Sequence, residues 1–460
     1  MLLMKRAAQR SLLALVWFSL VALACNLSNS QPPTLVPRPT ETPLPTIAYA
    51  TLSPEELPPQ VEPRVPSEAA LINLLNRVEA DRLFLHIDTL VNFRTRHVNS
   101  PMGMADQGIG AAFNYIQSQF EQISAESGGK LYVFPDGHQF RLTWAGVETI
   151  QRNAVAYLPG TEIGAGTILI GAHYDSVSSN PEDGLAYAPG ADDNGSGVAA
   201  LIELARILSA SPHKASILFV AFSAEEVGRQ GSAAFVRDYI QAQGIQLNAM
   251  FSLDIIGSQT GPNGAVDDRR IRIFSAGPNE SPSRQLARAI DLVAFNHMQN
   301  MDVLLHDAID REGRYSDHMS FSDAGYPAVR FIEALEEPNR HHTERDTLDD
   351  VHASYLTRST QLVLAVITAM ADGPRPPQNM TLRDNGNGLR TLVWEPVAGA
   401  TSYVVALRAP NSLEFNQQFE IANTSVQWDG FVPSRFAALA IAGRDANGLM
   451  GTPSVEYPIP

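Results

Sequence analysis

The sequence predicts an α/β protein with a mostly parallel, mixed sheet flanked by helices, followed by a small all-β sandwich. Two observations predict the α/β part. Short β-rich runs alternate with segments of helical spacing, and several of these runs are continuously apolar, as in strands covered on both faces. A third observation, the end of this pattern at a proline-rich boundary near residue 373, predicts the sandwich.

The first 25 residues have the layout of an export signal. Lys5, Arg6 and Arg10 form a basic start, and Ser11–Ala24 is an apolar stretch of 14 residues. This stretch is shorter than the ~20 residues that span a bilayer. Two processing routes remain open at its end: ordinary cleavage before Cys25, which releases a secreted protein, or lipidation of Cys25, as in a bacterial lipoprotein. Both routes predict an exported protein, and the second predicts a lipid anchor on the cell surface.

Residues 26–66 are predicted to be a Pro/Thr-rich linker. Eleven prolines fall between Pro32 and Pro66. Such a composition buries no core and favours extended polyproline conformations. The linker is interpreted either as a stalk that holds a catalytic head away from a membrane or as a disordered exported N-terminus, and the two interpretations are compatible.

The α/β domain is predicted over residues 67–372. Between residues 109 and 123, isoleucine and phenylalanine recur at steps of four and three, which predicts one apolar helix face. The apolar runs 168–170 and 217–222 hardly alternate, which predicts buried parallel strands. The expected strands are residues 154–158, 167–172, 215–222, 249–253, 271–275 and 328–332. The expected helices are residues 69–88, 108–123, 197–208, 232–243, 281–297 and 355–371.

Imidazoles and carboxylates follow these strands where each strand ends. Because the carboxyl ends of parallel strands meet at one edge of a sheet, we expect these side chains to lie together. Crowded carboxylates repel each other unless a cation lies among them. The residues in question are His173, Asp175, Asp192, Asp193, Glu225, Glu226, Asp254, His341, His342 and Asp346.

The residue types indicate the class of metal. Imidazole and carboxylate without thiolate suit zinc, with cobalt or manganese as alternatives. A single catalytic zinc needs about three protein ligands, and this edge offers more. Two metals ~3.5–4 Å apart, bridged by a carboxylate and a water, would use the available groups. Glu225 and Glu226 are adjacent and point differently, so one can bind metal while the other acts as a base.

The segments at this edge resemble those of the M28 family of co-catalytic zinc exopeptidases. The resemblance covers roughly residues 80–372, with five segments in the family's order. They are residues 171–176 (GAHYDS), 189–197 (PGADDNGSG), 224–228 (AEEVG), 253–254 (LD) and 342–347 (HTERDT). Residues 315–318 (YSDH) also resemble a family segment near the substrate, to which no roles are assigned.

The resemblance implies two Zn²⁺ ions per chain. His173, Asp193 and Asp254 would hold one ion, and Asp193, Glu226 and His342 the other, with Asp193 as the bridge. By spacing alone, the ligand could be either Asp192 or Asp193, and either His341 or His342. The alignment with the family's segments favours Asp193 and His342. The implied general base and acid is Glu225, and Asp175 would orient His173.

The implied activity is that of an aminopeptidase acting on peptides through a metal-bridging hydroxide. Alternatives on the same scaffold are a carboxypeptidase and a glutaminyl cyclase-like enzyme, and one of another class is an inactive surface-binding protein. Asp and Glu (49) outnumber Lys and Arg (33), which leaves a net charge of −16 and argues against a nucleic-acid partner. The single cysteine excludes a disulfide framework within the chain.

Residues 373–460 are predicted to form the second domain. Short alternating runs and turn signals such as residues 384–388 (DNGNG) predict an all-β sandwich. Residues 392–404 resemble a fibronectin type III module, with Trp394 as its core tryptophan and Tyr403 at the start of the next strand. The resemblance implies spacing or weak binding as its role and does not identify a partner.

Overall fold

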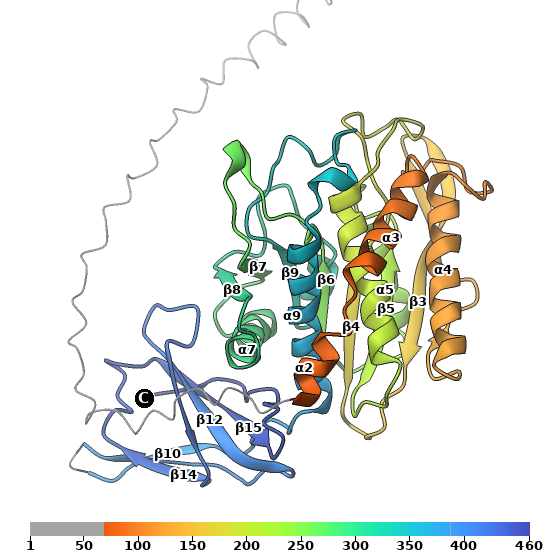
Figure 1. The fold of residues 1–460 in the computed structure, drawn as a ribbon. Helices are drawn as coiled ribbons and strands as arrows, with labels where there is room; N and C mark the ends of the chain where they lie inside the picture. The colour runs from red at the N-terminus through yellow and green to blue at the C-terminus, as the bar shows by residue number, and fades with distance from the viewer. Residues whose placement is uncertain (1–68, 387) are drawn as a thin grey trace, which may run out of the picture. The chain divides into compact units, whose positions relative to one another are not determined.

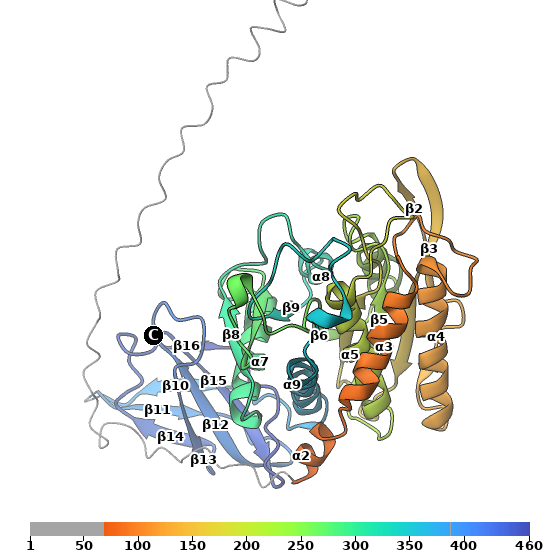
Figure 2. The ribbon, with the colours of Figure 1, turned by 45° about the horizontal axis from the view of Figure 1, so that its top comes forward.

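The computed structural model describes residues 69–386 and 388–460 of the chain. The predicted export signal (residues 1–25) and linker (residues 26–66) lie outside these residues. The described part contains a mixed sheet with helices on both faces, followed by two smaller antiparallel sheets (Figures 1 and 2). This architecture confirms the fold class that the sequence predicts.

Nine strands of the described chain form the large sheet. Their order is β1-β3-β5-β4-β6-β9-β7-β8, with β2 paired to β3 alone. The central strands β5, β4, β6 and β9 run parallel, whereas β3 and β7 are antiparallel to their inner neighbours. The strands are β1 (Tyr132–Val133), β2 (His138–Trp144), β3 (Val147–Leu158), β4 (Thr167–His173), β5 (Ser216–Phe222), β6 (Leu247–Leu253), β7 (Arg270–Ser275), β8 (Asp302–His306) and β9 (Ala328–Glu333).

Helices cover both faces of this sheet. The helices α3, α4, α5 and α9 share one apolar core with the sheet (Figure 1). The helices α6 and α8 share a smaller core on the opposite face. The helices are α2 (Ala69–Leu75), α3 (Ala80–Asn92), α4 (Gly108–Glu126), α5 (Gly197–Leu208), α6 (Gln230–Phe235), α7 (Pro282–His297), α8 (His318–Asp323) and α9 (Ala353–Asp372).

The continuous apolar runs reflect burial on both faces. In β4, Ile168 and Ile170 belong to the larger core, whereas Leu169 between them belongs to the smaller one. All seven residues of β4 are buried. Since neighbouring side chains of a strand point to opposite faces, a strand with two covered faces has no reason to alternate.

The structure departs from the predicted elements in several places. The predicted helix over residues 69–88 is two helices, α2 and α3, because tertiary contacts hold the break between them. There the Glu79 backbone N–H donates to Glu203 of α5 at 3.0 Å, and Arg206 donates to the Arg77 carbonyl at 2.7 Å. The strand β3 includes the predicted strand 154–158 but begins at Val147, and the predicted helix 232–243 is α6 followed by a π-helix, η3 (Val236–Gln241). The elements β1, β2, β8 and α8 were not predicted.

The C-terminal strands form two antiparallel sheets that share an apolar core. The sheets are β10-β11-β14 and β13-β12-β15-β16. Trp394 and Tyr403 lie in this core with ring centroids 5.4 Å apart. The strands are β10 (Thr381–Asp384), β11 (Arg390–Val393), β12 (Ala400–Arg408), β13 (Gln417–Ile421), β14 (Ser425–Trp428), β15 (Ala438–Asp445) and β16 (Tyr457–Pro458).

None of the helices within residues 69–386 and 388–460 combines the length and the apolar composition needed to cross a lipid bilayer.

Candidate metal centre

The predicted ligands meet at the carboxyl edge of the large sheet. His173 is the last residue of β4, and Asp254 directly follows β6. Glu226 lies in the loop after β5, and His342 lies in the loop after β9. Asp193 comes from η2 (Ala191–Ser196), the irregular turn that leads into α5. Five separate segments thus deliver one side chain each.

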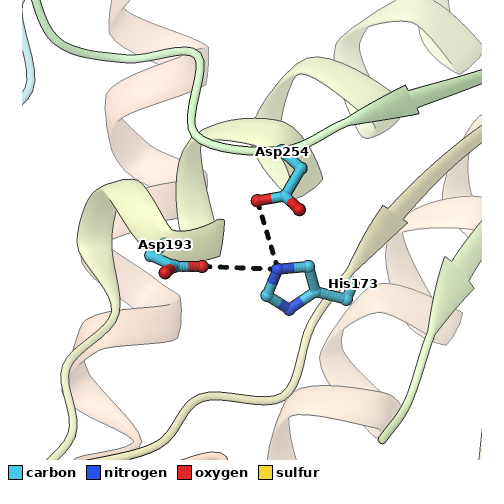
Figure 3. A group of neighbouring side chains, drawn as sticks. All are labelled: His173, Asp193 and Asp254. Atoms are coloured by element: carbon cyan, nitrogen blue, oxygen red, sulfur yellow. Dashed lines mark ion pairs between the residues drawn. The ribbon is translucent and has the colours of Figure 1, made fainter. Parts of the chain in front are cut away.

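The first cluster consists of His173, Asp193 and Asp254. His173 Nε2 lies 3.3 Å from Asp193 Oδ1 and 3.4 Å from Asp254 Oδ1, with both carboxylates pointing at the same ring nitrogen (Figure 3). All three side chains are buried. One imidazole nitrogen and two carboxylate oxygens therefore converge on one point.

The second cluster consists of Asp193, Glu226 and His342. His342 Nε2 lies 3.2 Å from Asp193 Oδ2 and 3.0 Å from Glu226 Oε2. Asp193 thus presents Oδ1 to the first cluster and Oδ2 to the second. This is the arrangement that a bridging carboxylate requires.

The two clusters fit a pair of divalent cations. In each cluster the three ligand atoms lie within 4.8 Å of one another. Two buried carboxylate oxygens of these clusters, Asp254 Oδ1 and Glu226 Oε1, have no hydrogen-bond partner in the described chain. Buried carboxylates are stable only when paired or bound to metal, and imidazole with carboxylate is a zinc donor set.

The electrostatics of the clusters favour positive charge at their centre. The negative charge of Glu226, with the contributions of Asp193, outweighs burial and raises the pKa of His342 to about 11. Burial by itself would raise the pKa of Asp193, but hydrogen bonds with His173 and His342 hold it well below its usual range. Two divalent cations would supply the positive charge that this field attracts.

Glu225 and Asp175 lie beside the ligands. The backbone N–H groups of Glu225 and Glu226 donate to the two oxygens of the Asp175 carboxylate at 3.0 and 3.1 Å. The Asp175 carbonyl is 3.2 Å from His173 Nδ1, closer than its carboxylate at 3.8 Å. Asp175 therefore connects the loop of the two glutamates to the ring of His173.

The backbone around the clusters is constrained. Ala224, Ile255 and His342 have φ values of 61°, 62° and 58°, which side-chain-bearing residues rarely adopt. Each is a predicted ligand or lies within two residues of one. A Cβ at Gly197 would lie 2.3 Å from the Leu253 carbonyl oxygen, so this approach requires glycine. Strain held at these positions is typical of functional sites.

Two buried arginines of the site were not predicted. Arg330 on β9 lies 3.2 Å from Asp254 Oδ2 and 3.0 Å from Asp310 Oδ2. As the one charged residue of the predicted strand 328–332 (AVRFI), it could have been identified from the sequence. Arg96 donates to the carbonyls of Pro189 and Gly190 at 2.5 and 2.9 Å and so supports the turn that carries Asp193. Its own sequence neighbourhood carries no comparable signal.

A polar cavity of about 170 Å³ opens onto the two clusters. Its walls include all five predicted ligands and Glu225, together with Arg229, Tyr315 and Arg330. The Arg229 guanidinium lies 5.7 Å from the ring centre of Tyr315. The cavity thus places a carboxylate, a phenol and cationic groups next to the ligands.

Asp192 and His341, the alternatives to Asp193 and His342 as metal ligands, lie elsewhere. Asp192 and His341 point into a separate buried cluster with Glu333. Neither takes part in the clusters around Asp193. This placement agrees with the choice of Asp193 and His342 over their neighbours.

Comparison with known proteins agrees with these observations. The sequence profile described as peptidase family M28 matches residues 153–367. A probable zinc metalloprotease of Pyrenophora tritici-repentis is 33% identical over 353 residues, which cover 68% of this chain and 80% of the relative. A second, from Pyricularia oryzae, is 33% identical over 373 residues and 74% of each chain.

Solved structures show the same fold. The LapA aminopeptidase of Legionella pneumophila aligns over 66% of this chain and 74% of its own, with a TM-score of 0.53 and 25% identity. The family, the fold and the donor set of the site therefore agree, and the predicted enzyme class is confirmed. The chain belongs to peptidase family M28 and is a zinc metallopeptidase.

Proposed function

We propose that the protein is an exported aminopeptidase that removes N-terminal residues from peptides with two zinc ions. The observation that carries the proposal is the position of Asp193, whose two carboxylate oxygens face different histidines. His173 and Asp254 would complete one zinc site, and Glu226 and His342 the other. The similarity to an aminopeptidase of known structure supports the substrate class.

The chemistry divides between the metals and the protein. When bound, zinc ions would polarise the scissile carbonyl and lower the pKa of a water molecule. Glu225 is buried beside the clusters and lines the same cavity, so its carboxylate is placed to accept a proton from the attacking water. The same carboxyl group then gives that proton to the departing amine. Asp175 holds the Glu225 backbone in place through its N–H.

The substrate class is tested with aminoacyl-nitroanilides and matched peptides. Hydrolysis should disappear with a chelator and return with Zn²⁺. Peptides with a free N-terminus should be shortened from that end, whereas N-acetylated versions of the same peptides should be resistant. Trimming of blocked peptides from the C-terminus would instead identify a carboxypeptidase.

The proton-transfer role is tested by the matched variants Glu225→Gln and Glu226→Gln. Glu225→Gln should keep both zinc ions and lose about 10²–10⁴-fold in kcat, the usual contribution of general acid–base catalysis. Glu226→Gln should instead lower the zinc content, measured by elemental analysis. Full activity in Glu225→Gln would remove Glu225 from the mechanism.

We also propose that the chain is exported through residues 1–25 and lipidated at Cys25, with residues 26–66 as a stalk before domains at 67–372 and 373–460. The basic start, the apolar stretch and the single cysteine support this proposal. Cys25→Ala should then release the protein from the membrane fraction. We further propose that residues 373–460 form a fibronectin type III-like module. Trp394 and Tyr403, which carry the resemblance, pack in the same apolar core, and this packing supports the proposal.

A further inference from the structure

A further group of buried side chains that could bind metal lies beside the two clusters that share Asp193. It consists of Asp192, Glu333 and His341, whose ligand atoms lie within 4.8 Å of one another, the same spacing as in the two clusters around Asp193. The three residues are 1%, 0% and 6% exposed. None of them belongs to the zinc sites proposed above.

Each carboxylate of this group accepts a backbone hydrogen bond at one of its oxygens. Asp192 Oδ1 accepts from the Gly257 N–H at 2.9 Å, and Glu333 Oε2 accepts from the Ser258 N–H at 2.8 Å. The other oxygens, Asp192 Oδ2 and Glu333 Oε1, are buried without a hydrogen-bond partner in the described chain, as is His341 Nδ1. The backbone after β6 therefore fixes both carboxylates and leaves one oxygen of each available to a ligand.

Within residues 69–386 and 388–460, the one cationic side chain paired with Asp192 is His341, whose Nε2 lies 4.0 Å from Asp192 Oδ2. No lysine or arginine among residues 69–386 and 388–460 forms an ion pair with Asp192 or Glu333. A third carboxylate, Asp346, is also buried there and accepts from the N–H groups of Asp192 and Asp193 at 2.8 and 2.9 Å. Buried carboxylates in such numbers require a cation or protons between them.

The space is that of one small ligand. A cavity of about 10 Å³ is lined by the three residues and by Ser258, Thr260, Glu337, Asp346 and Arg340, whose guanidinium is paired with a further wall residue, Asp350. A volume of this order holds about one water molecule or one ion. Two carboxylates and an imidazole suit a divalent transition metal better than Ca²⁺ or Mg²⁺, which prefer oxygen alone.

We propose that Asp192, Glu333 and His341 bind a third divalent transition-metal ion, separate from the zinc pair. The ion connects the turn that carries Asp193, the end of β9 and the loop that carries His342. Asp192 and His341 are the immediate neighbours of two predicted zinc ligands. The third site is therefore structural, because it stabilises the segments that carry the zinc ligands Asp193 and His342.

Metal counting with Zn²⁺ as the probe tests this proposal. The full-length protein, loaded with Zn²⁺ and passed over a chelating resin, should contain three ions per chain. Glu333→Gln keeps the size of the side chain and should contain two. The matched control Glu337→Gln lines the same cavity, but its carboxylate accepts from Asn339 instead, so it should contain three.

Neither the metal count nor a crystallographic test depends on enzymatic activity. A third anomalous peak at the zinc edge, between Asp192, Glu333 and His341, would place the ion in a crystal of the wild-type protein. Two ions per wild-type chain, with no peak there, would overturn the proposal and indicate that a shared proton holds the carboxylates together. This result would leave the aminopeptidase proposal intact. Should Glu333→Gln fail to fold, the wild-type count and the anomalous map still decide.

Discussion

Arg330 shows how much one side chain contributes to the site. It is buried on β9 and bonds two buried carboxylates, Asp254 and Asp310. Burial by itself would raise the pKa of Asp254, but the charges of Arg330 and His173 hold it below its usual range. The guanidinium therefore keeps a predicted zinc ligand ionised and fixed in place.

We expect Arg330→Met to destabilise the protein strongly. The variant keeps the apolar stem but removes the buried guanidinium that Asp254 and Asp310 share, and breaking a buried pair costs about 3–5 kcal/mol. Urea unfolding of chelator-treated protein measures the loss without a contribution from metal. Arg141→Met is the control, because its ion pair with Glu148 is exposed and should contribute less than about 1 kcal/mol. Equal losses in the two variants would contradict this account.

At the same scale, the sequence identifies some site residues and conceals others. His173, Glu226 and Asp254 could be predicted because each follows an apolar run at the sheet edge, where polar residues stand out. Arg96 could not, since its partners are carbonyl groups of Pro189 and Gly190, which any residue carries. The positive φ of Ile255 is likewise a product of tertiary packing, because a β-branched residue does not favour it.

At the scale of elements, prediction succeeded where burial alone decides structure. The helix over residues 197–208 has the predicted bounds, and the central strands end where predicted or within one residue. The hairpin β2–β3 has many exposed residues at its tip, so its hydrophobic pattern is weak. The break between α2 and α3 depends on the Glu79–Glu203 contact, which joins residues 124 positions apart. Local periodicity contains no information about such a contact.

An ion pair joins the segment before β5 to the end of α9, at the edge of the sheet opposite the site. His213, in the segment before β5, has its Nδ1 2.7 Å from Asp372 Oδ2 at the end of α9. Burial lowers the pKa of His213, but the hydrogen bond and charge of Asp372 outweigh it, so the net pKa is raised. A group with a raised pKa in the folded state stabilises fully below its unfolded pKa, near 6.5. The stabilisation is lost as the pH rises through the folded value.

We therefore expect His213→Gln to lose stability in a pH-dependent way. The difference in unfolding free energy between wild type and variant should be largest at pH 6 and should shrink towards pH 9. Glutamine keeps a hydrogen-bond donor but does not titrate. The difference between wild type and variant therefore reports the protonation of His213. Urea unfolding at both pH values measures it. A difference that stays constant with pH would mean that His213 acts by packing alone.

At the scale of the whole molecule, the C-terminal sheets share apolar contacts with the α/β part. In β12, Tyr403 and Val405 belong to the sandwich core, whereas Val404 and Ala406 belong to the core of the large sheet. The buried Arg288 of α7 donates to Glu456 at 2.9 Å and to the Leu413 carbonyl at 2.7 Å. One strand therefore contributes to two cores, and a buried ion pair lies between the same parts.

This sharing predicts that residues 69–460 unfold as one cooperative unit. Were the two parts independent, calorimetry would resolve two transitions with separate midpoints. We expect a single transition, because unfolding of the sandwich would remove Val404 and Ala406 from the core of the large sheet and would separate Arg288 from Glu456. Glu456→Ala should lower the midpoint of that whole transition, since breaking a buried pair costs several kcal/mol. A variant that shifted only part of the heat absorption would show that the sandwich is an independent module joined to the peptidase by a chain connection alone.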